Sequence, residues 1–198
     1  MIRYSVTTIL ILLGAFVAQQ FLPAFTGIYD SRVLLVQLVF LCCAVTVAQP
    51  VMLALAFIGG FLWDAQCTLG PHGGDPSVYT QSVESLKFGY SILLFAGMGA
   101  LMQGIQPLFR RGIWQVSALL CCIAVFLYLL AEFAIITFVR GDLIVSRELF
   151  YKMAFTAFFT AFFSPLVFIL LDRIARRFDH NLFPESVRKK RKATIPVR

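Results

Sequence analysis

Few side chains in this sequence are placed to carry out chemistry, and the clearest candidate is Glu132. It lies in the apolar segment YLLAEFAIITFVR and is the only ionisable residue well inside a hydrophobic run. An acid in lipid is costly, and its presence raises a functional hypothesis. Glu132 could instead lie near Arg140 at a membrane surface, or stay protonated against a hydroxyl such as Thr156 or Thr160. A proton relay needs a chain of titratable groups that the sequence does not show, so we expect a structural role.

A second group of reactive side chains, Cys67, His72 and Asp75, lies in the polar segment 65–87. The segment contains neither a C-x-x-C pair nor two histidines at helical spacing, so we expect no metal site. Its glycine pair at 73–74 lacks the Lys and Ser/Thr of a phosphate-binding loop. With no nucleophile, base or metal set, we expect no enzyme and no cofactor.

A different kind of function is indicated by small residues in the apolar segment 50–64, PVMLALAFIGGFLWD. Ala56, Gly60 and Asp64 are spaced at i, i+4 and i+8 and therefore share one helix face, beside Gly59. Small residues let helices approach closely in lipid. Asp64 follows a tryptophan and either marks the membrane surface or makes a polar contact with a neighbouring helix.

The segment 88–107 repeats this pattern with Ala96, Ala100 and Gly104. We expect it to pack as a helix within a bundle. The spacing does not decide whether the partner helix belongs to this chain or to another protein.

The composition indicates an integral membrane protein. The chain has 198 residues, of which 60% are hydrophobic and 14% charged, whereas soluble domains have about 25% charged residues. We predict one helical bundle over 1–177 and a basic tail over 178–198. Most of the net charge of +7 lies at the C-terminal end, next to a hydrophobic span. This placement favours a membrane-flanking basic segment over a nucleic-acid site. The five cysteines include two adjacent pairs in apolar runs, which favours packing roles over disulfides.

The predicted fold is all-α, a polytopic bundle of six transmembrane helices. The N-terminal apolar run is interpreted as a retained span rather than a cleaved signal. The second and third spans are short and are separated at Pro50, which favours a tight helical hairpin over a re-entrant or tilted pair. Pro165, after Ser164, is expected to kink the last span. The six spans are predicted at 5–22, 33–49, 51–64, 88–107, 113–139 and 150–171.

Charge placement supports six spans with both termini in the cytoplasm. The segments assigned to the inside hold 12 of the 17 basic residues, and the outside segments hold the other 5 together with six acids, as the positive-inside rule requires. Anionic lipid should attract the basic end at ~1 kcal/mol per residue near the surface. The basic residues expected at the lipid surface are Arg173, Arg176, Arg177, Arg188, Lys189 and Lys190.

The order of these features resembles the MreD family, rod shape-determining membrane proteins of bacteria. The resemblance covers roughly residues 33–177 and rests on GGFLWDAQ, a Leu-Gly step at 69–70, a span that begins FGY and ends PLFRR, and SPLVFILLDRI. Asp64 and Pro165 match its sharper positions. The polar segment between Leu69 and Lys87 is longer here than in the family.

The resemblance implies a non-enzymatic component of the cell-elongation complex in the bacterial inner membrane. The implied partners are MreC, MreB, the RodA glycosyltransferase and a penicillin-binding transpeptidase, and the implied role is support of peptidoglycan synthesis and cell shape. Neither nucleic acid nor a small-molecule substrate is expected. The two small-residue faces and Glu132 are the candidate packing or partner contacts.

An alternative function is the substrate-binding membrane subunit of an energy-coupling-factor vitamin transporter, which has a similar size and helix number. Such a subunit needs polar groups that converge on an outward cavity. Five side chains could supply them: Asp64, His72, Tyr79, Glu84 and Glu132.

Overall fold

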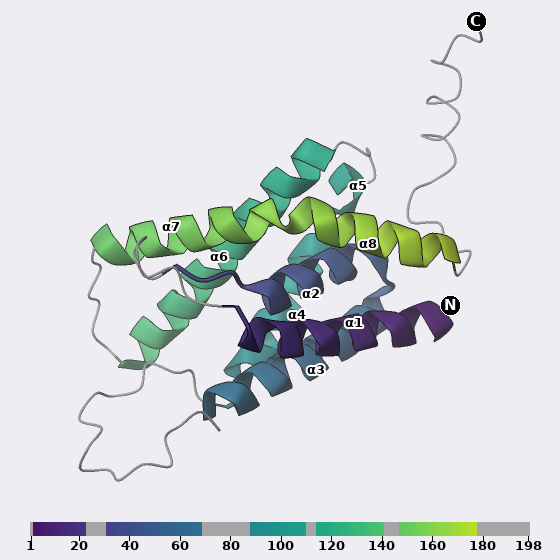
Figure 1. The fold of residues 1–198 in the computed structure, drawn as a ribbon. Coiled ribbons are helices and arrows are strands. Elements are labelled where there is room, and N and C mark those ends of the chain that lie inside the picture. Colours follow the sequence, from purple (N-terminus) through teal and green to yellow (C-terminus); the bar gives the residue numbers. More distant parts are fainter. Residues whose placement is uncertain (1, 23–30, 69–87, 110–113, 141–146, 178–198) are drawn as a thin grey trace, which may run out of the picture.

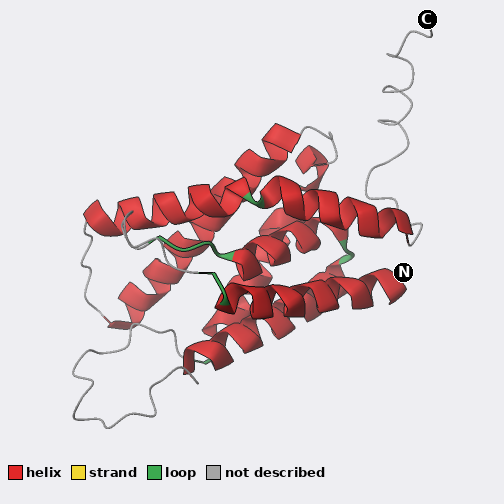
Figure 2. Ribbon diagram, in the orientation of Figure 1, coloured by secondary structure: helices red, strands yellow, loops and turns green. Residues whose placement is uncertain are grey.

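The computed structural model describes residues 2–22, 31–68, 88–109, 114–140 and 147–177. These residues are helical apart from short connections, and none of them forms a β-strand (Figure 2). The all-α prediction is therefore confirmed. The helices are α1 (Ile2–Gln20), α2 (Leu35–Thr46), α3 (Gln49–Thr68), α4 (Tyr90–Gly104), α5 (Gln106–Phe109), α6 (Trp114–Arg140), α7 (Arg147–Phe162) and α8 (Ser164–Arg177).

The short helix α2 occupies the centre of the bundle. It contacts α1, α3, α4, α6, α7 and α8, and the ten residues from Val36 to Val45 are all buried. Figure 1 shows α7 and α8 in succession on one side of α2, with α1 and α3 on the other. Because α2 has apolar residues on every side, with Gln37 and Thr46 as its polar residues, it is stable only where other helices cover every face.

Two helical stretches are long and apolar enough to cross a membrane: Gln115–Val139 and Arg147–Arg177. The latter comprises α7 and α8. α2 and α4 are shorter apolar helices. At 1.5 Å per residue, the 12 residues of α2 extend about 18 Å, less than the ~30 Å hydrocarbon core of a bilayer.

The six predicted helices correspond to α1, α2, α3, α4, α6 and the α7–α8 pair. The predicted hairpin at Pro50 is present, since α2 ends at Thr46 and α3 begins at Gln49 and contacts it. Pro50 lies in the first turn of α3, where its missing N–H has no intrahelical role. The end of the third helix was predicted wrongly at residue 64. α3 continues one turn further, to Thr68, and Asp64 is buried within it instead of lying at a helix end.

The predicted break at Pro165 lies between α7 and α8. Phe163 is a turn residue between the two helices, and its N–H bonds the Thr160 carbonyl over 3.1 Å, a tighter turn than in an α-helix. Pro165 has no N–H to donate to the carbonyl of Ala161, which explains the interruption.

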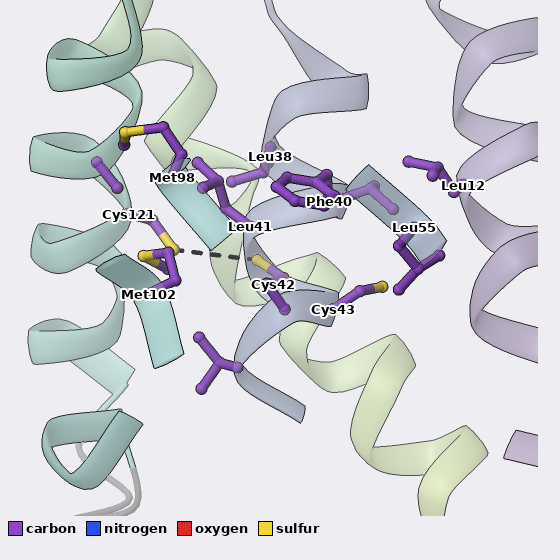
Figure 3. Packing of buried hydrophobic residues seen from close by; sticks show 14 of the residues in the cluster. Leu12, Leu38, Phe40, Leu41, Cys42, Cys43, Leu55, Met98, Met102 and Cys121 are labelled. Atoms are coloured by element: carbon purple, nitrogen blue, oxygen red, sulfur yellow. Dashed lines mark hydrogen bonds between the residues drawn. The ribbon is translucent and has the colours of Figure 1, made fainter. Parts of the chain in front are cut away.

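The core around α2 is filled by side chains from the surrounding helices, some of which are drawn in Figure 3. Cys42 of α2 and Cys121 of α6 face each other with their sulfur atoms 4.0 Å apart. Cys42, Cys43 and Cys121 are buried free thiols, in packing positions as expected. The labelled residues that meet here are Leu38, Phe40, Leu41, Cys42 and Cys43 of α2, Leu12 of α1, Leu55 of α3, Met98 and Met102 of α4, and Cys121.

Candidate functional site

The face formed by Ala56, Gly60 and Asp64 packs against α4 of the same chain. A Cβ atom at Gly60 would lie 2.5 Å from the Ile92 Cα and 2.9 Å from the carbonyl carbon of Ser91. Two helix backbones therefore touch at this point, and only glycine permits that approach. Ala56 is buried as well. This small-residue face is fully used inside the chain.

Asp64 ends this contact face with a polar interaction. Its Oδ2 accepts a hydrogen bond of 2.6 Å from the backbone N–H of Gly89, and the side chain is buried. Gly89 is the residue before α4 and has φ +100°, a conformation that favours glycine. A carboxylate at this end of α4 also faces the positive end of the helix dipole. Of the two roles considered for Asp64, the structure places it in the helix contact.

Gly59 lies on the adjacent side of α3 and packs toward two other helices. A Cβ atom here would lie 3.1 Å from the Phe95 ring of α4 and 3.4 Å from Leu12 of α1. Gly59 thus lets three helices meet.

The second small-residue face points largely away from the bundle. Ala96 is half-buried at its edge, whereas Ala100 and Gly104 are exposed. Cβ atoms added at Gly97 or Gly104 would meet nothing within 4 Å. The expectation that this face packs inside the bundle therefore does not hold for Ala100 or Gly104. We call the surface of Ala96, Gly97, Ala100 and Gly104 the open α4 face.

The glycine of α4 that does pack inside is Gly99, which the sequence analysis did not single out. A Cβ atom there would overlap the sulfur of Met52 and lie 3.0 Å from the Phe40 ring. Gly99 faces Met52 and Phe40, whereas Gly97 faces open space. The spacing of small residues along α4 does not predict which of these two glycines packs against other helices.

Glu132 is half-buried on α6, and the charge of Asp64 on α3 influences it electrostatically. The hydroxyls of Thr156 and Thr160, considered as partners for Glu132, instead accept backbone N–H groups of residues 32 and 34.

A set of side chains that the sequence analysis did not predict holds the N-terminal end of α2. The amide of Gln19 on α1 accepts from the Leu35 N–H over 2.6 Å and donates to the Val33 carbonyl over 2.7 Å. Thr160 on α7 accepts from the Leu34 N–H over 3.0 Å. These bonds satisfy backbone groups that the start of a helix leaves without intrahelical partners.

The C-terminal end of α2 is held in the same manner. Gln106 donates to the Val45 carbonyl over 2.6 Å, and Gln103 donates to the Val47 carbonyl over 3.4 Å. The Tyr4 hydroxyl of α1 donates to Thr46 over 2.9 Å. Both ends of a helix too short to cross a bilayer are thus capped by side chains of its neighbours. In the sequence, these capping side chains are recognisable only as isolated polar residues within or beside apolar runs.

The basic residues expected at the lipid surface are described only in part. Arg173, Arg176 and Arg177 are exposed on the last turns of α8, and Arg176 pairs with Asp172. Residues 188–190 lie outside the described part of the chain, as does the segment 69–87 with His72, Tyr79 and Glu84. No group of three metal-binding side chains occurs among the described residues.

Comparison of the chain with protein-family models, with curated proteins and with solved structures gives no match.

Proposed function

We propose that this protein is a non-enzymatic, multi-pass component of the bacterial cell-elongation complex, located in the inner membrane. It supports peptidoglycan synthesis and cell shape by binding helices of partner proteins. The partners that the resemblance to MreD implies are MreC, MreB, RodA and a penicillin-binding transpeptidase.

The open α4 face is the observation that carries this proposal. Exposed Leu93 and Leu101 lie on the same helix as this strip of small residues. Helices in lipid gain little from hydrophobic burial and associate where small residues permit close contact. The corresponding face of α3 is occupied by α4, whereas the space over Gly97 and Gly104 is open. A partner helix would find its contact surface here.

A cytoplasmic location for both termini is supported by where the first and last helices end. The N-terminal end of α1 and the C-terminal end of α8 lie at the same end of the molecule (Figure 1). Arg3 is exposed at the first, and Arg173, Arg176 and Arg177 are exposed at the second. Basic residues gathered at one end are typical of a cytoplasmic surface.

The test is affinity purification of the tagged protein from its own membrane in mild detergent, followed by mass spectrometry. We expect elongation proteins to accompany the unmodified chain and to be lost from Gly97→Leu, because a leucine holds a partner helix at a distance. Gly14→Leu is the matched control, since Gly14 is also an exposed helical glycine with nothing within 4 Å of its added Cβ. Loss of the partners from both variants, or from neither, would remove the open α4 face from the proposal.

One observation favours the transporter subunit as a second candidate. Asp64 and Glu132 are carboxyl groups on different helices, and the charge of Asp64 influences Glu132; a substrate site would need such polar groups to converge. Recovery of paired ATPase subunits in the same purification would select this function and reject the elongation complex.

A further inference from the structure

The side-chain amide of Gln37 is buried in the first turn of α2, without a hydrogen-bond partner in the described part of the chain. Gln37 is 1% exposed, and within the described part of the chain neither its Nε2 nor its Oε1 atom has a hydrogen-bond partner. A carboxamide removed from water without replacement bonds is strongly unfavourable in an apolar interior. A molecule that both donates and accepts hydrogen bonds would satisfy it.

Gln37 lies where the backbone of α2 also has donors to spare. The first intrahelical bond of α2 joins the Leu38 N–H to the Leu34 carbonyl, so the four N–H groups of residues 34–37 have no intrahelical acceptor. Gln19 and Thr160 accept from Leu35 and Leu34. Among the described residues, no acceptor is found for the N–H groups of Val36 and Gln37. Helix side chains lean toward the N-terminus, which directs the Gln37 amide toward this same end.

The chemistry of this site selects its ligand. It offers several N–H donors and one carbonyl acceptor but no charge, since Asp64 is the only charged side chain among the buried described residues and it bonds Gly89. A charged ligand would lose its hydration without an opposite charge to replace it. The adjacent Val36 and Leu38 are both fully buried, which favours a very small molecule.

We propose that the N-terminal end of α2 binds ordered water, held by the Gln37 amide and the free N–H groups of the first turn. Water both accepts and donates, so it can bond N–H donors and Oε1 together. The hydroxyl of Ser31 is also buried and has no partner among the described residues. This inference does not depend on the elongation complex or on any partner.

The first test compares Gln37→Met with Leu38→Met in thermal unfolding of the purified full chain. Methionine approximates the volume of glutamine but binds no water, and Leu38→Met controls for a methionine in the first turns of α2. If water is bonded to the Gln37 amide, replacing the amide with a thioether leaves the water with fewer hydrogen bonds and weakens its contact with the backbone donors. We expect Gln37→Met to lower the melting temperature by roughly 2–8 °C more than the control. If Gln37→Met melted at the same temperature as the Leu38→Met control, or higher, the Gln37 amide would have no bonding partner, and the proposal would be overturned.

The second test uses the unmodified protein and does not depend on whether a variant folds. Hydroxyl radicals generated by X-ray radiolysis of bound water label the side chains beside it. We expect millisecond labelling at Val36 and none at Val45, a buried valine near the opposite end of α2. If Val36 is as inert as Val45, the water site does not exist.

Discussion

Asp64, near the end of α3, accepts a hydrogen bond from the backbone N–H of Gly89, the residue that precedes α4, over 2.6 Å. One helical turn earlier, Gly60 touches the first turn of α4 at Ile92. The same face of α3 thus supplies a close backbone contact and a buried acceptor to the same neighbour. This pairing orients α4 and leaves its other side facing outward.

Asp64→Ala should lower the free energy of unfolding by about 1–3 kcal/mol, because the Gly89 N–H loses its acceptor in a partly buried position. Asp64→Asn keeps an oxygen at this position and should cost less. Thermal unfolding of the purified variants measures both effects. An alanine variant as stable as the unmodified protein would contradict the role of this bond.

Alanine at Gly60 and at Gly97 should have opposite effects. Gly60→Ala forces α3 away from the α4 backbone and should cost about 1–3 kcal/mol, whereas Gly97→Ala meets open space and should gain up to about 1 kcal/mol of helix stability. Gly60→Leu should abolish function at normal expression. Unfolding curves of the two alanine variants measure these changes in the free energy of unfolding. The prediction would be wrong if both variants were stabilised or both were destabilised.

Thr160→Val should destabilise the protein by about 1–3 kcal/mol, since valine keeps the shape of threonine but leaves the Leu34 N–H without its acceptor. Thr156→Val is the matched control one turn away, where the bond to the Arg32 N–H is longer, at 3.4 Å, and residue 32 is exposed. Hydrogen exchange at Leu34 should become faster in Thr160→Val alone. Similar losses in both variants would argue against a specific cap at Leu34.

Mild oxidation should link Cys42 to Cys121 in a chain whose other three cysteines are replaced by alanine. Their sulfur atoms are 4.0 Å apart, so a movement of about 1 Å by each would reach the ~2.05 Å of a disulfide. With a protease site inserted between residues 69 and 87, the two fragments should migrate as one band in denaturing electrophoresis after cleavage. They should separate when the disulfide is reduced. The Cys121→Ser variant, which cannot form this disulfide, is the control. If the fragments of the oxidised protein with both cysteines separated without reduction, Cys42 of α2 would not lie beside Cys121 of α6.

Glu132→Gln should be tolerated, with stability equal to or slightly above that of the unmodified protein. The substitution keeps the size and polarity of the side chain and removes its repulsion with Asp64. Cell-shape complementation and thermal unfolding measure the two parts of this prediction. A variant that fails with glutamine but works with aspartate would show that the charge itself is required.

The sequence by itself determined the helical class, the approximate position of each helix and the breaks beside Pro50 and Pro165. These features depend on local properties, namely the length of apolar runs and the missing N–H of proline, which the residues express wherever the helices lie. It also located both small-residue faces, because spacing along a helix fixes which side chains share a side.

Only the tertiary structure decided what those faces contact. Gly60 and Gly97 look alike in sequence, yet one meets the backbone of α4 and the other meets open space. The capping of α2 joins Leu34 to Thr160 and Leu35 to Gln19, residues from separate helices. No local pattern encodes such bonds, because they form only after the surrounding helices have enclosed a segment whose backbone groups must then find partners.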